Sequence, residues 1–205
     1  MTHNIISGDR ALAETDFETA VRRASRGFHD AGVRPGDSVA LFLRNDFPFL
    51  VASHAAIRLG AYAVPVNWHF KAEEVAYILA DCGARVLVVH ADLWPQIAEG
   101  VPSGILVLVA PTAPELAVAY RIAPDATRVP AGMTDWDTWL ASHAPWDGPA
   151  APPTTSMIYT SGTTGRPKGV RLRHSSWVYE GEAIRAQGIL SEDDLEFRWL
   201  PLAHS

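Results

Sequence analysis

The sequence predicts an α/β fold in which helices flank a parallel sheet. Short apolar runs, such as VALFL at residues 39–43 and RVLVVH at residues 85–90, are typical of strands that are buried on both faces. These runs alternate with segments in which apolar residues recur at helical spacing. Strands that are separated by helices pair in parallel through crossover connections.

The first predicted helix follows a capping box. Thr15 at the cap and Glu18 three residues later fit this motif, and apolar residues recur at helical spacing from residue 17 to residue 31. Gly32 can end the helix. The elements that follow are a strand at 39–43, a helix that Asn45 or Asp46 caps and that runs to 60, a strand at 63–66, a helix at 71–82, a strand at 85–90, a short helix at 92–99 and a strand at 105–109.

The composition changes after residue 110, because eight of the fifteen prolines fall between Pro111 and Pro153. Such a segment is typical of an irregular surface excursion, and we predict one short helix in it at 136–140. The chain therefore divides into a first α/β subdomain at 1–110, a proline-rich excursion and connector at 111–155, and a last segment at 156–205. In that last segment we expect a helix from Ser175 or Ser176 to 187, an acidic turn at 191–194 and a strand at 195–200.

The last segment begins with MIYTSGTTGRPKGV at residues 157–170. An apolar run precedes six small residues, four of them hydroxylic, and alternation with period two resumes at Val170, which predicts a loop between two strands. Glycines let backbone N–H groups approach an anion, hydroxyls add donors, and Arg166 and Lys168 add positive charge. The loop is suited to holding phosphates, although a flexible connection is the alternative. It is not a Walker A loop, because Gly169 and a strand pattern follow Lys168.

The segment at 159–170 resembles the signature phosphate loop of the adenylate-forming superfamily, which includes acyl-CoA synthetases, aryl-CoA ligases, luciferases and the adenylation domains of peptide synthetases. GVRPGDSVA at 32–40, IRLGAYAVPVN at 57–67 and LPLAHS at 200–205 also resemble family segments. The resemblance therefore runs from about residue 10 to residue 205. Residues 67–69 and 86–92 look most like acyl-CoA synthetases of the fatty-acid type.

The resemblance implies a two-step reaction and a role for each loop residue. A carboxylate attacks the α-phosphate of ATP to give an acyl-adenylate and pyrophosphate, and the thiol of coenzyme A then displaces AMP. Lys168 would face the pyrophosphate, and His204 would lie near the α-phosphate and the acyl pocket as the candidate catalytic residue. The remaining candidates for binding the β- and γ-phosphates, through hydroxyls, N–H groups or a close approach of the backbone, are Thr160, Ser161, Gly162, Thr163, Thr164 and Gly165.

The family's magnesium-binding, ribose-binding and catalytic-lysine motifs have no match in this sequence. The resemblance therefore implies the N-terminal part of a large domain, with the Mg²⁺ ligands outside this chain, and we expect the 205 residues alone to be inactive. One alternative is a fragment that binds nucleotide or phosphate weakly without catalysis. Another is an adenylation enzyme that passes the acyl group to a carrier protein. A homodimer is one alternative for the oligomeric state.

The composition limits the other function classes. The net charge of −6, from 23 acidic and 17 basic residues, argues against a nucleic-acid partner bound through bulk charge. Cys82 is the only cysteine, so an intrachain disulfide and a cysteine-based zinc site are excluded. We find no signal-peptide pattern and no apolar run of about 18 residues, and we expect a cytoplasmic protein. His54 and His69 are expected to have no catalytic role, and Trp177 and Trp199 are expected in the core.

Overall fold

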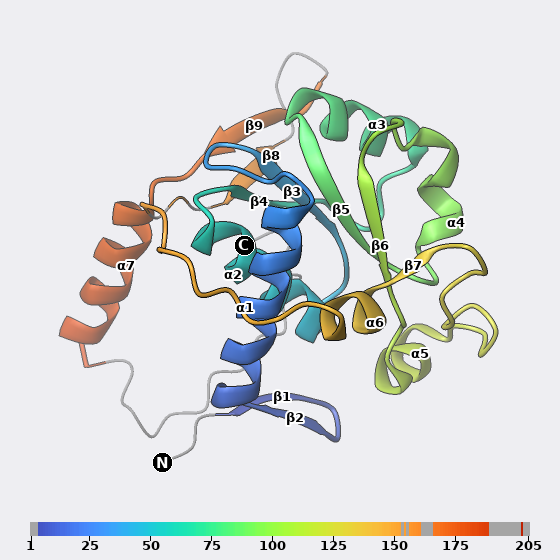
Figure 1. The fold of residues 1–205 in the computed structure, drawn as a ribbon, viewed down its shortest axis with the longest axis horizontal. Coiled ribbons are helices and arrows are strands. Elements are labelled where there is room, and N and C mark those ends of the chain that lie inside the picture. The colour runs from blue at the N-terminus through green and yellow to red at the C-terminus, as the bar shows by residue number, and fades with distance from the viewer. Residues whose placement is uncertain (1–3, 153, 155, 161–165, 189–201, 203–205) are drawn as a thin grey trace.

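The computed structural model describes residues 4–152, 154, 156–160, 166–188 and 202. Within them, five strands form a parallel sheet in the order β4-β3-β5-β6-β7, and helices pack on both of its faces (Figure 1). This arrangement confirms the α/β fold class. The strands are β3 (Ser38–Phe42), β4 (Tyr62–Pro65), β5 (Ala84–His90), β6 (Leu106–Ala110) and β7 (Thr134–Asp135).

Two hydrophobic clusters lie on opposite faces of the sheet, because successive strand residues point to opposite sides. Leu41 and Val88 belong to the first cluster, whereas Ala40 and Leu87 belong to the second. The first cluster packs under α1 (Glu14–Asp30), α2 (Phe47–Arg58) and α6 (Trp136–Ala141). The second packs under α3 (Ala72–Asp81) and α4 (Trp94–Ile97), and the 3₁₀ turn η1 (Ala98–Gly100) follows α4 directly.

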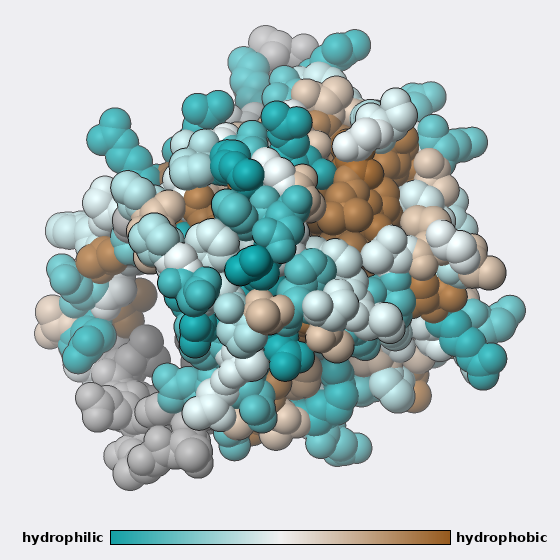
Figure 2. Space-filling view, viewed as in Figure 1, coloured by the Kyte–Doolittle hydropathy of each residue, from teal (hydrophilic) through white to brown (hydrophobic). Residues whose placement is uncertain are grey.

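Hydrophobic side chains also gather on the surface of the molecule over β5 and β6, beside α1 (Figure 2). None of the helices in the described part of the chain is both long enough and apolar enough to cross a membrane.

Two of the three predicted helix caps differ from the structure. Strand β2 (Arg10–Ala13) leads directly into α1, so Thr15 already lies in the first helical turn and the predicted capping box is wrong. The N-cap position of α7 (His174–Ala186) is Arg173, whose side chain makes no cap hydrogen bond, rather than a serine. Asp46 does cap α2, because its side chain accepts a hydrogen bond from the N–H of Phe47 at 2.7 Å.

The segment after residue 110 is more ordered than the proline pattern predicts. It contains α5 (Pro114–Tyr120) and the strand β7, neither of which was predicted, in addition to the predicted helix α6. Trp136 at the start of α6 is only 2% exposed and belongs to the first cluster. The hairpin of β1 (Asn4–Ser7) and β2 was also not predicted. The three-part division of the chain stays a proposal.

Helix α7 contains no buried residue along its length. Trp177 on this helix is 42% exposed, so the expectation that it lies in the core is wrong. The predicted turn at 191–194, the strand at 195–200 and Trp199 lie outside the described residues.

Candidate functional site

The predicted phosphate loop joins the two strands of a hairpin. Strand β8 (Met157–Thr160) pairs antiparallel with β9 (Lys168–Arg171), which confirms the strand–loop–strand prediction (Figure 1). Thr160 and Lys168 are direct partners in this register, so they stand opposite each other where the two strands enter the loop. Both residues are exposed, as is Arg166, so a ligand in solvent can reach them.

The structure therefore brings together two of the predicted site residues, Thr160 and Lys168. Their paired positions supply one hydroxyl and one ammonium group at the base of the loop. The other candidates lie outside the described residues, and their roles stay predictions: Ser161, Gly162, Thr163, Thr164, Gly165 and His204.

One face of the hairpin packs on the body of the protein. Met157 is buried in the second hydrophobic cluster, and Tyr159 packs against the same cluster. Because strand residues alternate in direction, Thr160 points away from the face that Met157 and Tyr159 share. The packing of β8 thus turns the hydroxyl of Thr160 toward the solvent.

Helix α3 contacts the hairpin on both sides of the loop. The hydroxyl of Tyr77 donates to the carbonyl oxygen of Pro167 at 3.1 Å, and the guanidinium carbon of Arg166 lies 5.3 Å from the centroid of the Tyr77 ring. The hydroxyl of Tyr159 donates to Oδ2 of Asp81 at 2.5 Å. Burial, followed by the bond to Asp81, raises the pKa of Tyr159, so its hydroxyl remains a donor at neutral pH.

The hairpin also continues from the edge strand β4. Ala63 forms a parallel bridge with Ser156, and Oγ1 of Thr154 donates to the carbonyl oxygen of Ala61 at 2.6 Å. Farther along the hairpin, the guanidinium carbon of Arg171 lies 5.2 Å from the centroid of the Tyr62 ring. These contacts fix the base of the hairpin beside the sheet.

A cavity of about 930 Å³ lies between the end of β9, β4 and α7. It is lined by cationic groups, one carboxylate and aromatic rings, among them Tyr62, Arg171, Arg173, Tyr179 and Glu182. Thr160, Arg166 and Lys168 do not line it. This cavity is therefore separate from the described part of the phosphate loop.

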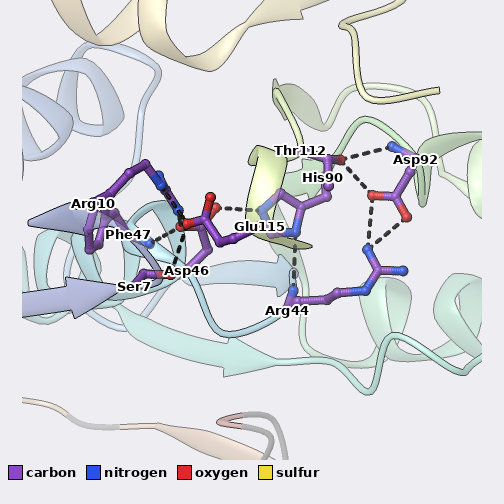
Figure 3. A network of polar contacts seen from close by, with 9 residues as sticks. All are labelled: Ser7, Arg10, Arg44, Asp46, Phe47, His90, Asp92, Thr112 and Glu115. Carbon is purple, nitrogen blue, oxygen red and sulfur yellow. Dashed lines mark hydrogen bonds and ion pairs between the residues drawn. The ribbon is translucent and has the colours of Figure 1, made fainter. Parts of the chain in front are cut away.

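A second group of polar residues lies where the parallel strands end (Figure 3). Arg44 follows β3, His90 ends β5, and Thr112 follows β6. Nη1 of Arg44 donates to both carboxylate oxygens of Asp92, at 2.9 and 2.7 Å, and the hydroxyl of Thr112 donates to Oδ1 of Asp92 at 2.6 Å. Ligands often bind at this edge in open α/β sheets, which makes the network an alternative candidate site.

The charged groups of this network are paired within the protein, although the buried Nε of Arg44 has no hydrogen-bond partner. The N–H of Arg44 donates to Nδ1 of His90 at 3.2 Å, so Nε2 carries the hydrogen that faces Asp46 Oδ2 at 3.3 Å. Arg10 donates to Asp46 Oδ1 at 2.6 Å. Burial would raise the pKa of Asp46, but the bonds from His90, Arg10 and the N–H of Phe47 together lower it below its ordinary value.

This network holds the strand ends together and is closed to ligands, because the side chains of Arg44, Asp46, His90 and Asp92 are at most 6% exposed. Sequence analysis did not single it out. The sequence feature that could have indicated this network is the occurrence of polar residues directly after each buried apolar strand. The hairpin of β8 and β9 therefore remains the candidate site.

The chain matches the family described as AMP-binding enzyme over residues 3–205, and it belongs to that family. The resemblance to adenylate-forming enzymes is thereby confirmed. A feruloyl-CoA synthase from an Amycolatopsis species is 33% identical over 199 residues, which cover 97% of this chain and 35% of the relative. A fatty acid–[acyl-carrier-protein] ligase from Streptomyces coeruleorubidus is 30% identical, with 92% of this chain and 33% of the relative covered. The chain thus spans about a third of the length of these relatives.

Solved structures show the same fold. The anthranilate CoA ligase AuaEII, in complex with anthranoyl-AMP, superposes with a TM-score of 0.71 at 26% identity, over 86% of this chain and 32% of the ligase. The acyl-CoA synthetase of Brucella canis gives a TM-score of 0.75 at 23% identity, over 98% of this chain and 35% of the synthetase.

Proposed function

We propose that this chain contributes the triphosphate-binding part of an enzyme that activates a carboxylic acid with ATP. The observation that carries the proposal is the exposed pair of Thr160 and Lys168 at the base of a Gly/Thr-rich loop. Family membership supports it, as does the acyl-adenylate bound in the related ligase. The products would be an acyl-adenylate and pyrophosphate, followed by an acyl-CoA thioester.

The chemical difficulty of the first step is to bring a carboxylate anion to a polyanion. Positioned N–H and O–H donors and a fixed cation reduce this repulsion and stabilise the leaving pyrophosphate. Lys168 would supply the cation, and Thr160 with the loop residues 161–165 would supply the donors. We propose His204 as a further group near the α-phosphate.

Three finer statements belong to the same proposal. Mg²⁺ would neutralise the phosphates, held by ligands for which this sequence has no matching motif. The acid would be a fatty acid, as the fatty-acid relatives support, whereas the feruloyl relatives support an aromatic acid. The acyl acceptor would be coenzyme A, with a carrier protein as the alternative that one relative supports.

The test of the phosphate role is the change Lys168→Ala. We expect it to weaken ATP binding about tenfold or more, since hydrogen bonds to charged groups contribute roughly 1.5–3 kcal/mol. Isothermal titration calorimetry with ATP measures this change. Arg173→Ala is the control. Arg173 is also an exposed cation, but it lies after β9, at the N-cap position of α7, and not beside the loop. Equal ATP affinities for the parent and Lys168→Ala would contradict the proposal.

Hydroxylamine trapping of the acyl-adenylate tests the activity of the chain alone. We expect no hydroxamate from the 205-residue chain with ATP, Mg²⁺ and a panel that includes a fatty acid and ferulate. Turnover by this chain would overturn the proposed inactivity, and the acid that reacts would identify the substrate class.

A further inference from the structure

Helix α3 meets the phosphate-loop hairpin through two residues that are four positions apart. Tyr77 and Asp81 lie on one face of α3, because residues four apart are neighbours on a helix surface. Tyr77 contacts Pro167 just after the loop, and Asp81 contacts Tyr159 just before it. The two contacts therefore lie at Tyr159, next to Thr160, and at Pro167, next to Lys168.

The two contacts differ in chemistry. The bond from Tyr159 to Asp81 joins a phenol to a carboxylate at 2.5 Å, which is the short, charge-assisted kind. Tyr77 makes a neutral hydrogen bond to a backbone carbonyl and also lies against Arg166, whose guanidinium carbon is 5.3 Å from the ring centroid. Tyr77 thus holds the backbone immediately before Lys168 and also orients the preceding cation.

Gly169 makes room for this arrangement. A Cβ atom at this position would lie 3.0 Å from Met157 Sδ and 3.0 Å from Tyr159 Cζ, closer than side chains normally approach. The ring of Tyr159 therefore lies directly over the glycine that follows Lys168. In this position the hydroxyl of Tyr159 reaches Asp81.

We propose that Tyr77 of α3 is a positioning residue for Lys168. It holds the backbone at Pro167 by a hydrogen bond and places its ring under the guanidinium of Arg166, so that Lys168 faces the triphosphate. The identity of the ligand, ATP, rests on the proposed function, whereas the contacts of Tyr77 with Pro167 and Arg166 do not depend on it. Tyr77 lies about 90 positions from the loop in sequence. Of the predicted phosphate-binding residues that the structure describes, Thr160 and Lys168, neither is a hydrogen-bond partner of Tyr77, so Tyr77 acts on Lys168 through the backbone of Pro167.

The experiment combines limited trypsin digestion with ATP binding. Trypsin cuts after Lys168, whereas Pro167 prevents cleavage after Arg166, so mass spectrometry of the fragments reports the freedom of this one peptide bond. Cleavage after the exposed Arg121 serves as the internal reference. Tyr77→Phe removes the hydroxyl and keeps the ring, and Tyr77→Leu removes both. Tyr179→Phe is the matched control, because Tyr179 is 76% exposed on α7.

We expect Tyr77→Phe to raise the ratio of Lys168 to Arg121 cleavage roughly fivefold, as the loss of one neutral hydrogen bond predicts. Tyr77→Leu should raise it further, and Tyr179→Phe should leave it unchanged. ATP should bind several-fold more weakly to Tyr77→Leu than to Tyr77→Phe, because only the latter keeps the ring under Arg166. A general loss of stability would raise cleavage after Lys168 and after Arg121 together. Thermal unfolding of each variant detects such a loss.

The outcomes separate this inference from the proposed function. Selective cleavage at Lys168 in the Tyr77 variants, with weaker ATP binding, supports the inference. If the parent binds no ATP but Tyr77→Phe still exposes Lys168, the proposed function fails and the positioning contact stands. If the parent binds ATP and the Tyr77 variants match it in cleavage and affinity, the inference is overturned and the proposed function is unaffected.

Discussion

Asp46 performs two tasks at one position. Its carboxylate caps α2 through the N–H of Phe47, and it accepts hydrogen bonds from Arg10 and His90. The side chain is 2% exposed, so its charge is kept only because these three donors replace water. The start of α2, strand β2 and the end of β5 therefore meet at a single carboxylate.

The substitution Asp46→Asn should reveal how much the negative charge of Asp46 contributes to the free energy of unfolding, since asparagine is also a good helix cap. We expect the free energy of unfolding to fall by about 2 kcal/mol at pH 7, as for the loss of charged hydrogen bonds. The pKa of Asp46 is lowered in the folded protein from its ordinary value of 3.8. Its contribution is therefore complete above about pH 5 and disappears as the pH falls through 3.8 and below.

Urea unfolding of both proteins at pH 7, 5 and 3.5 measures this effect. The difference between parent and Asp46→Asn should shrink toward the lowest pH. Asp125→Asn, at an exposed position, is the control and should change the stability by less than about 0.5 kcal/mol. A difference that is the same at every pH would show that the charge of Asp46 is not what stabilises the fold.

At the scale of elements, α1 and α6 approach each other through a glycine. A Cβ atom at Gly27 in α1 would lie 2.4 Å from Cζ2 and 2.5 Å from Cη2 of Trp139 in α6. The ring of Trp139 also lies 5.5 Å from that of Phe28, centroid to centroid. The glycine thus lets an indole lie directly on the helix backbone, which draws α6 onto the first hydrophobic cluster.

Two substitutions of glycine by alanine should change the free energy of unfolding in opposite directions. Alanine is favoured over glycine inside a helix by roughly 1 kcal/mol. Gly181→Ala in α7 meets no atom within 4 Å, so we expect it to stabilise that helix by up to about this amount. Gly27→Ala should instead lower the free energy of unfolding by about 1–3 kcal/mol, because the new methyl group overlaps Trp139.

Chemical denaturation, with circular dichroism as the signal, compares these two variants. If Gly27→Ala were as stable as the parent, the close approach of α1 and α6 would be excluded. A loss of helix signal in Gly181→Ala would contradict the open surroundings of α7.

At the scale of the whole molecule, the order of the elements shows what the sequence can predict. The buried runs of β3, β5 and β6 and the helices between them follow from local periodicity, and their predicted bounds differ from the structure by a few residues at most. Strand β7 has only two residues and is defined by its pairing with β6, so no local pattern marks it. The first helix begins before Thr15 because of β2, which the periodicity did not reveal.

The same limit applies to the candidate site. The loop residues and Lys168 are recognisable from their order in the sequence, and the register that pairs Lys168 with Thr160 follows from the hairpin. Tyr77 could not be found this way, because it lies on a helix that is remote in sequence and whose apolar residues suffice to explain its packing. Contacts of this kind arise from the tertiary arrangement alone.

Hydrogen exchange should divide the molecule into protected and labile parts. Strand β5 lies in the middle of the sheet with a paired strand on each side, and six of its seven residues are buried. Helix α7 has no buried residue. We expect mass spectrometry to show slow exchange for peptides of β3 and β5 and fast exchange for peptides of α7, because opening α7 exposes little apolar surface. Equal protection of α7 and β5 would refute this division.

The two edge strands of the parallel sheet, β4 and β7, affect how molecules of the protein can associate. On one side β7 offers a strand of only two residues, and on the other β4 ends at Pro65 and is bridged by Ser156 to the chain that leads into β8. Short edge strands and a proline leave few free N–H and C=O groups for an added strand. In the part of the chain that the structure describes, the edge strands of this sheet therefore offer few backbone groups with which a second molecule could pair to begin amyloid-like growth.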